Sequence, residues 1–77
     1  MRECYVSFAS AIEVHEFVSI ATKQRFPIQV ERGNLLTNAK SIMSLCSMGF
    51  NRPLHVLFPA AADSAAFLTA VRPFVVA

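Results

Sequence analysis

The sequence predicts an α+β fold, an open-faced sandwich in which three helices cover one face of a four-stranded antiparallel sheet. Three observations support it: a short segment alternates apolar and polar residues, a helical apolar period follows a capping sequence, and a glycine turn separates two β-forming segments. The segments follow in the order β-α-β-β-α-β-α. An antiparallel sheet with its helices on one face is the usual arrangement for such an order.

The N-terminal part of the chain contains one predicted strand and one predicted helix. Alternating apolar residues predict a half-buried strand over 3–8; these are Cys4, Val6 and Phe8. Ser10 and Glu13 have the spacing of a capping box, in which Ser10 caps the first helical turn and Glu13 accepts from the Ser10 backbone N–H. A helix over 11–22 should follow. Its apolar stripe consists of Val14, Phe17, Val18 and Ala21.

The rest of the chain divides at turn residues. The expected elements are strands over 27–32, 35–38 and 54–59 and helices over 41–48 and 62–72. Gly33 and Asn34 fit a type II′ hairpin turn, where glycine supplies the positive φ. Ser41 is the expected N-cap of the second helix, and Gly49 should follow its end. Pro73 should kink or end the last helix, because proline lacks a backbone N–H.

Length and composition predict one domain over 1–77 and exclude several classes of protein. Hydrophobic residues make up 55% of the chain, far above the content of a disordered protein. The Lys and Arg residues are scattered and the net charge is +2, which argues against a nucleic-acid partner. No apolar run could span a bilayer, and the start does not resemble a signal peptide, so we expect a cytoplasmic protein without membrane association. Cys4 and Cys46 have no metal-ligand spacing and should be plain thiols, and no cofactor or metal is expected.

The segment from Asn38 to Gly49 resembles the regulatory segment of the histidine-containing phosphocarrier (HPr) proteins of the bacterial sugar phosphotransferase system. In that family an Asn and a Lys-Ser-Ile-Met sequence precede a short helix, as Asn38 and Lys40-Ser41-Ile42-Met43 do here. Ala21-Thr22-Lys23 is similar to the family's Ala-Ser-Lys at the end of its first helix, and the spacing between the two segments matches without a gap. The resemblance covers nearly the whole chain. It implies an HPr-like fold with strand order 1-4-2-3.

The same register departs from the family where its chemistry takes place. Ser10 stands where the family has the histidine that accepts a phosphoryl group from phosphoenolpyruvate through enzyme I. Ile12 replaces the arginine that would clamp the phosphate, and Glu13 replaces a proline. A neutral imidazole is a nucleophile at pH 7 whereas a lone serine hydroxyl needs a base, and Glu13 would repel a phosphate at the helix start. We therefore expect no catalytic residue and no enzyme activity.

The resemblance implies an HPr-like regulatory or protein-binding domain. Ser41 matches the family's regulatory phosphorylation site, and a docking surface is expected around it. Its expected residues are His15, Lys40, Ile42, Met43 and Cys46, with Leu45 and Met48 buried on the opposite face of the second helix. Partners would be phosphotransferase-system components or a transcriptional regulator, and the chain itself a monomer or weak homodimer. Two alternatives remain: an active phosphocarrier that uses His15, and an unrelated oligomerising or small-ligand domain.

Overall fold

The computed structural model describes residues 1–61 and 63–76. The elements are β1 (Arg2–Val6), α1 (Ala11–Thr22), β2 (Gln29–Arg32), β3 (Leu35–Asn38), α2 (Ile42–Ser47), β4 (Leu54–Phe58), α3 (Ser64–Ala70) and the 3₁₀ helix η1 (Arg72–Phe74). Their order confirms the predicted α+β sequence of elements. None of the helices in these residues is long and apolar enough to cross a membrane.

The four strands form one antiparallel sheet in the order β1-β4-β2-β3, which confirms the predicted order. Because side chains alternate between faces, the register places Cys4, Val56 and Val30 in one row toward the helices. The neighbouring row, on the opposite face, contains Tyr5, His55, Glu31 and Leu36. The first row is buried, whereas the second is only partly covered.

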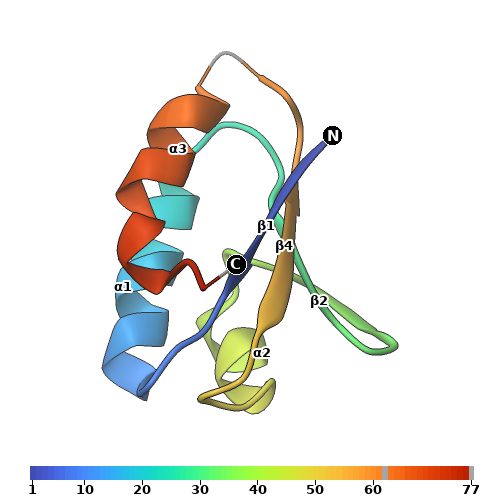
Figure 1. Cartoon of the computed structure of the whole chain (residues 1–77), viewed down its shortest axis with the longest axis vertical. Helices are drawn as coiled ribbons and strands as arrows, with labels where there is room; N and C mark the ends of the chain where they lie inside the picture. Colours follow the sequence, from blue (N-terminus) through green and yellow to red (C-terminus); the bar gives the residue numbers. More distant parts are fainter. Residues whose placement is uncertain (62, 77) are drawn as a thin grey trace.

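The helices lie on one side of this sheet, as predicted. Figure 1 shows α1 and α3 next to each other on the same side of β1 and β4, and α2 at the bottom of the view. α2 packs against α1. The β2–β3 hairpin projects away from the helices (Figure 1). Gly33 has a φ of +58° at the hairpin tip, as the predicted turn requires. The arrangement leaves the other sheet face open.

The core between the layers is rich in phenylalanine. Phe17 of α1 is fully buried, with its ring centroid 5.2 Å from that of Phe8 and 6.2 Å from that of Phe67. Phe67 in turn lies edge-on to Phe58, at 5.2 Å, and to Phe26, at 6.0 Å. These contacts join α1, α3 and β4 through one continuous apolar cluster.

The ends of the predicted strands differ from those observed. β1 ends at Val6 because its partner β4 begins opposite it, at Leu54, after Pro53, which has no backbone N–H to donate to the ladder. On the other edge of β1, the Ser7 backbone N–H donates to the Phe74 carbonyl at 2.9 Å. Phe8 is nevertheless buried, as the alternation predicted. β2 begins at Gln29, two residues after Pro27, and β4 stops before the proline that follows it.

The predicted last helix is two elements rather than one. α3 spans Ser64–Ala70 with Asp63 at its N-cap, and η1 follows with Pro73 inside it. Part of the predicted range, Ala62, lies outside the described residues. Beyond η1, Val75 forms a bridge to Val6, and the Val76 N–H donates to the Tyr5 carbonyl at 2.9 Å. This tail, residues 74–76, therefore runs along the outer edge of β1.

Candidate partner-binding site

Side chains from the first turn of α1 and its N-cap accept hydrogen bonds from backbone N–H groups at the start of the helix. The Ser10 hydroxyl accepts from the Glu13 backbone N–H at 3.4 Å, as predicted. The Glu13 carboxylate accepts from the Ala9 backbone N–H at 2.9 Å, one residue before the predicted partner at Ser10. The reach of the glutamate side chain across the turn accounts for this shift. A carboxylate thus occupies the end of the helix to which a phosphate would be attracted.

Two other residues near the start of α1 face solvent. Ile12 is 73% exposed and brings no charge to the start of α1. His15 is exposed on α1, one turn further along. Within residues 1–61 and 63–76, no ion pair or hydrogen bond of the His15 side chain is present, so no neighbouring group orients its imidazole.

Ser41 is the N-cap residue directly before α2, as the sequence predicts, but its side chain does not cap the helix. Its carbonyl accepts the first helical hydrogen bond, from the Leu45 N–H at 3.1 Å. The Ser41 hydroxyl donates instead to the Ser44 hydroxyl at 3.0 Å. Ser41 is half-buried, so its oxygen lies at the edge of α2 and not inside the core.

The two faces of α2 differ sharply in burial. Leu45 is fully buried and Met48, directly after the helix, is 2% exposed, which confirms the predicted buried pair. On the other face Met43 is 82% exposed, while Ile42 and Cys46 are half-buried. This confirms the predicted partial exposure. A shallow hollow of about 540 Å³ lies over this face and is lined by Ile42, Met43, Cys46 and Ser47, named here the α2 patch.

The other predicted members of this surface do not line the hollow. His15 is absent from its lining, although α1 and α2 pack against each other. Lys40 lies just before α2, but its ammonium donates to the Gln24 carbonyl at 2.9 Å and is held against the end of α1. The exposed apolar part of the α2 patch is therefore carried by Ile42, Met43 and Cys46.

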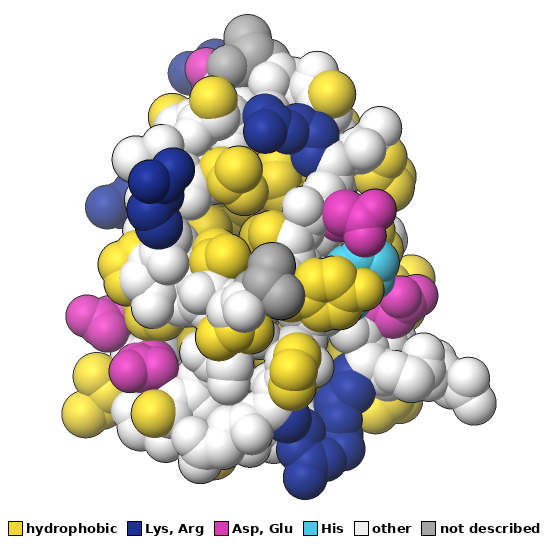
Figure 2. Space-filling model, viewed as in Figure 1, with side chains coloured by type: hydrophobic (Ala, Val, Ile, Leu, Met, Phe, Trp, Pro, Cys, Tyr) yellow, Lys and Arg dark blue, Asp and Glu magenta, His cyan; other side chains and the backbone are white. Residues whose placement is uncertain are grey.

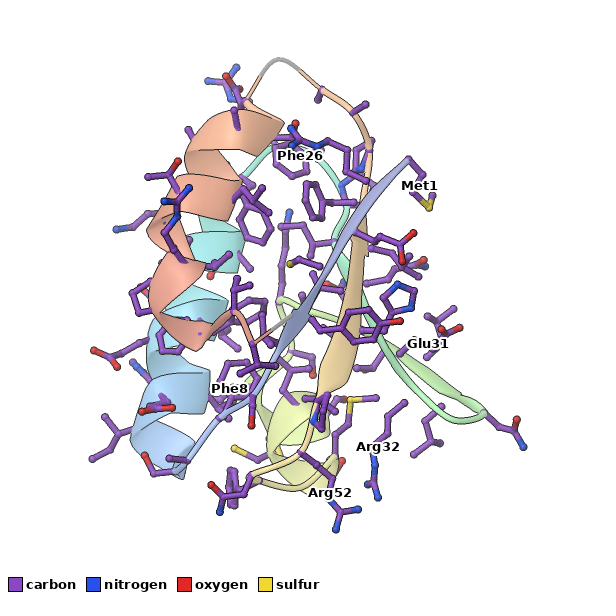
Figure 3. The ribbon with its side chains drawn as sticks, in the orientation of Figure 1. Met1, Phe8, Phe26, Glu31, Arg32 and Arg52 are labelled. Atoms are coloured by element: carbon purple, nitrogen blue, oxygen red, sulfur yellow. The ribbon has the colours of Figure 1, made fainter. Side chains whose placement is uncertain are left out.

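Two arginines at the far end of α2 were not predicted from the sequence. Arg32 donates to the Met48 carbonyl at 2.7 Å and so satisfies a carbonyl at the helix C-terminus. A β-carbon at Gly49 would lie 3.5 Å from Arg52 Cδ and 3.7 Å from Arg32 Nη1, so both side chains approach the same glycine. Figure 3 shows Arg32 and Arg52 at the same end of the molecule. Gly49, which the sequence predicted to follow the helix, and Asn51 both have a positive φ in this turn, at +94° and +57°.

The two cysteines have different surroundings, and both are free thiols. Cys4 is buried in β1, and burial raises the pKa of its thiol. Cys46 is half-buried in the α2 patch. Across the described ranges, no three His, Cys, Asp or Glu side chains are grouped so that they could hold a metal ion.

A second polar group lies on the open face of the sheet. The two ring nitrogens of His55 contact different carboxylates, Nε2 with Glu3 at 2.6 Å and Nδ1 with Glu31 at 3.1 Å. The Tyr5 ring stacks on the imidazole at 4.7 Å. Figure 2 shows this group as a cyan side chain between magenta ones. The hydrogen bond with Glu31, and then that with Glu3, raises the pKa of His55, while partial burial opposes the rise.

No protein-family model and no curated protein sequence matches the chain. Solved structures do. HPr-C-His from Thermoanaerobacter tengcongensis is 26% identical, with a TM-score of 0.76 over 95% of this chain and 89% of that one. The phosphocarrier protein HPr from Bacillus anthracis is 23% identical, with a TM-score of 0.75 over 97% and 96% of the two chains.

The histidine-containing phosphocarrier protein of a Mycoplasma is 14% identical, with a TM-score of 0.72 over 94% of this chain and 89% of that one. In all three the match extends over almost the whole of both chains. The strand order and the helices on one sheet face agree with this likeness. The chain therefore has the fold of the HPr phosphocarrier proteins.

Proposed function

We propose that this chain is a phosphotransferase-type HPr-like protein that binds protein partners through the α2 patch and does not itself carry phosphoryl groups. The observation that carries the proposal is the split of α2 into a buried face, with Leu45, and an exposed apolar face, with Met43 at 82% exposure. A short helix gains nothing for its own stability by exposing such a side chain. Exposed apolar area of this kind supplies affinity when a partner covers it.

The start of α1 supports the absence of phosphocarrier activity. Ser10 and Glu13 are engaged in capping hydrogen bonds, and Ile12 offers no positive charge. The neighbours in fold are named phosphocarrier proteins, which supports partners among phosphotransferase components. A transcriptional regulator is the other class of partner, and the cytoplasm the expected compartment. The chain would act there by binding and not as an enzyme.

Ser41 is proposed as the switch of this surface. Its hydroxyl is half-buried, contacts Ser44 and precedes the first residue of the α2 patch. A phosphate at Ser41 would add nearly two negative charges beside Ile42. Binding to an acidic partner would weaken, and binding to an arginine-rich partner would strengthen.

Binding to a partner isolated with the wild-type chain tests the patch. Met43→Glu should weaken binding at least about tenfold, because a charge would be desolvated in the interface. Leu35→Glu is a matched control, since Leu35 is an exposed leucine on the hairpin, 59% accessible and outside the patch. Ser41→Asp should change affinity, whereas Ser19→Asp on exposed α1 should not. Equal binding by Met43→Glu and Leu35→Glu would refute docking through the α2 patch.

Phosphotransfer is tested separately with enzyme I and labelled phosphoenolpyruvate. We expect no acid-labile label on the chain. His15 is exposed, so label that appears on the wild type and is lost in His15→Ala would establish the alternative, an active carrier that uses His15. A result of that kind would contradict the non-carrier part of the proposal and leave the binding experiment unaffected.

A further inference from the structure

A second hollow shares no lining residue with the α2 patch. It is a half-open cleft of about 470 Å³ between the connection from α1 to β2 and the edge strand β3. Its lining consists of Arg25, Phe26, Pro27, Ile28, Gln29, Leu36, Thr37, Asn38 and Lys40. The volume is within the range of small-molecule sites.

The charge of this cleft is entirely positive. Arg25 and Lys40 line it, and no Asp or Glu does. Of the ion pairs in the described part of the chain, none involves these two residues; both join His55 to a glutamate. The Lys40 ammonium donates to the Gln24 carbonyl at 2.9 Å, a contact that fixes its position without neutralising its charge. The cleft thus holds one fixed cation and one exposed cation that lack an anionic partner.

The remaining lining is divided between polar donors and apolar carbon. The Asn38 carboxamide oxygen accepts from the Lys40 backbone N–H at 2.9 Å, which leaves the amide NH₂ group to donate to a ligand. Thr37 and Gln29 add a hydroxyl and a second amide. Pro27 and Leu36, the latter 55% exposed, provide an apolar wall. A ligand that matches this lining has an anionic end, groups that accept hydrogen bonds and a carbon body.

We propose that the cleft binds a small organic phosphate, a monoester whose phosphate lies between Arg25 and Lys40 and whose carbon body lies against Pro27 and Leu36. Two cations favour a group with close to two negative charges at neutral pH, and a guanidinium can hold two phosphate oxygens at once. A free phosphate ion would leave most of the cleft to water and the apolar wall uncovered. The site is independent of the function proposed for the α2 patch.

The test is an amide chemical-shift titration of the whole chain with phenyl phosphate, at constant ionic strength and a pH of about 8, where the ester is a dianion. Saturable shifts are expected at Phe26, Ile28, Thr37 and Asn38, with a dissociation constant of about 1 mM or tighter. Arg25→Gln should weaken binding at least about tenfold. Arg72→Gln, an exposed arginine of η1 outside the cleft, should leave it unchanged.

Phenol and inorganic phosphate separate the two halves of the ligand. Each should bind at least about tenfold more weakly than phenyl phosphate. If phenol binds equally well, the anionic site is refuted; if inorganic phosphate binds equally well, the role of the apolar wall is refuted. Absence of saturable shifts, or equal binding by the Arg25→Gln and Arg72→Gln variants, would overturn the proposal as a whole.

Discussion

The His55 side chain connects three strands on the open sheet face. It lies on β4, and its ring nitrogens contact Glu3 of β1 and Glu31 of β2. Both nitrogens donate when the imidazole is protonated, so both carboxylates are satisfied. When the proton leaves, one nitrogen presents a lone pair to a carboxylate oxygen, and that contact becomes repulsive. This geometry is the reason for the raised pKa of His55.

The raised pKa predicts a pH dependence of stability. The folded chain binds the His55 proton more tightly than the unfolded chain, whose imidazole has the ordinary value of 6.5. The stabilisation is therefore complete below pH 6.5 and is lost as the pH rises through the folded-state pKa. Its size should stay below about 1 kcal/mol, because solvent screens partly exposed pairs.

Urea unfolding of wild type and His55→Gln at pH values on both sides of 6.5 measures this loss. The decline in unfolding free energy above that pH should disappear in His55→Gln. His15→Gln is the control, because His15 is exposed on α1, away from both carboxylates, and its replacement should leave the decline intact. A decline of equal size in His55→Gln would contradict the assignment.

For single residues, the sequence predicted hydrogen bonds between neighbours in the chain but not contacts between residues that are distant in the chain. The Ser10 cap was predictable because its donor lies three positions away. The contacts of His55 with Glu3 and Glu31 join residues 52 and 24 positions apart, and only the sheet register brings them together. Alternation along each strand placed Glu3 on the outer face but could not name its neighbour.

Among the elements, α2 has one face that is buried in the core and an opposite face that is exposed and proposed to bind a partner. Leu45→Ala should lower the unfolding free energy by about 2–5 kcal/mol, since it removes a fully buried side chain and leaves a cavity. Met43→Ala should change it by less than about 0.5 kcal/mol, because that side chain is 82% exposed. Denaturant unfolding of both variants provides the comparison. Similar losses in the two would mean that α2 packs differently from the structure.

The periods of the elements were predictable, whereas several of their ends were not. The bounds of α1 were predictable, because its start is marked by the local cap at Ser10 and its length by the apolar spacing that follows. The end of β1 at Val6 depends on where its partner β4 begins, at Leu54, a residue distant in the sequence. Lys40 was expected at the rim of the patch but lies against Gln24, a contact that tertiary packing alone creates.

For the whole molecule, the phenylalanine cluster is the main link between the layers. Phe67→Ala should cost about 3–5 kcal/mol, since its ring contacts Phe17, Phe26 and Phe58. A chain this short has only about 4–12 kcal/mol to lose, so this loss removes at least about a quarter of the unfolding free energy and should lower the melting temperature clearly. Phe50→Ala, at a position 37% exposed, is the matched control and should cost much less. Thermal unfolding followed by circular dichroism distinguishes the two, and equal melting temperatures would contradict this role of the cluster.

The position of residues 74–76 along β1 also bears on how copies of this chain could join. In the described part of the chain, Phe74 and Val76 bond to the outer edge of β1 at Ser7 and Tyr5, whereas β3 pairs with β2 alone. Strand addition should therefore favour the β3 edge, where Leu35 and Leu36 are both more than half exposed. Two copies that paired there would occupy each other's β3 edge and turn the partly covered β1 edges outward. Further edge-to-edge growth from the folded state should consequently be less favourable than the first pairing.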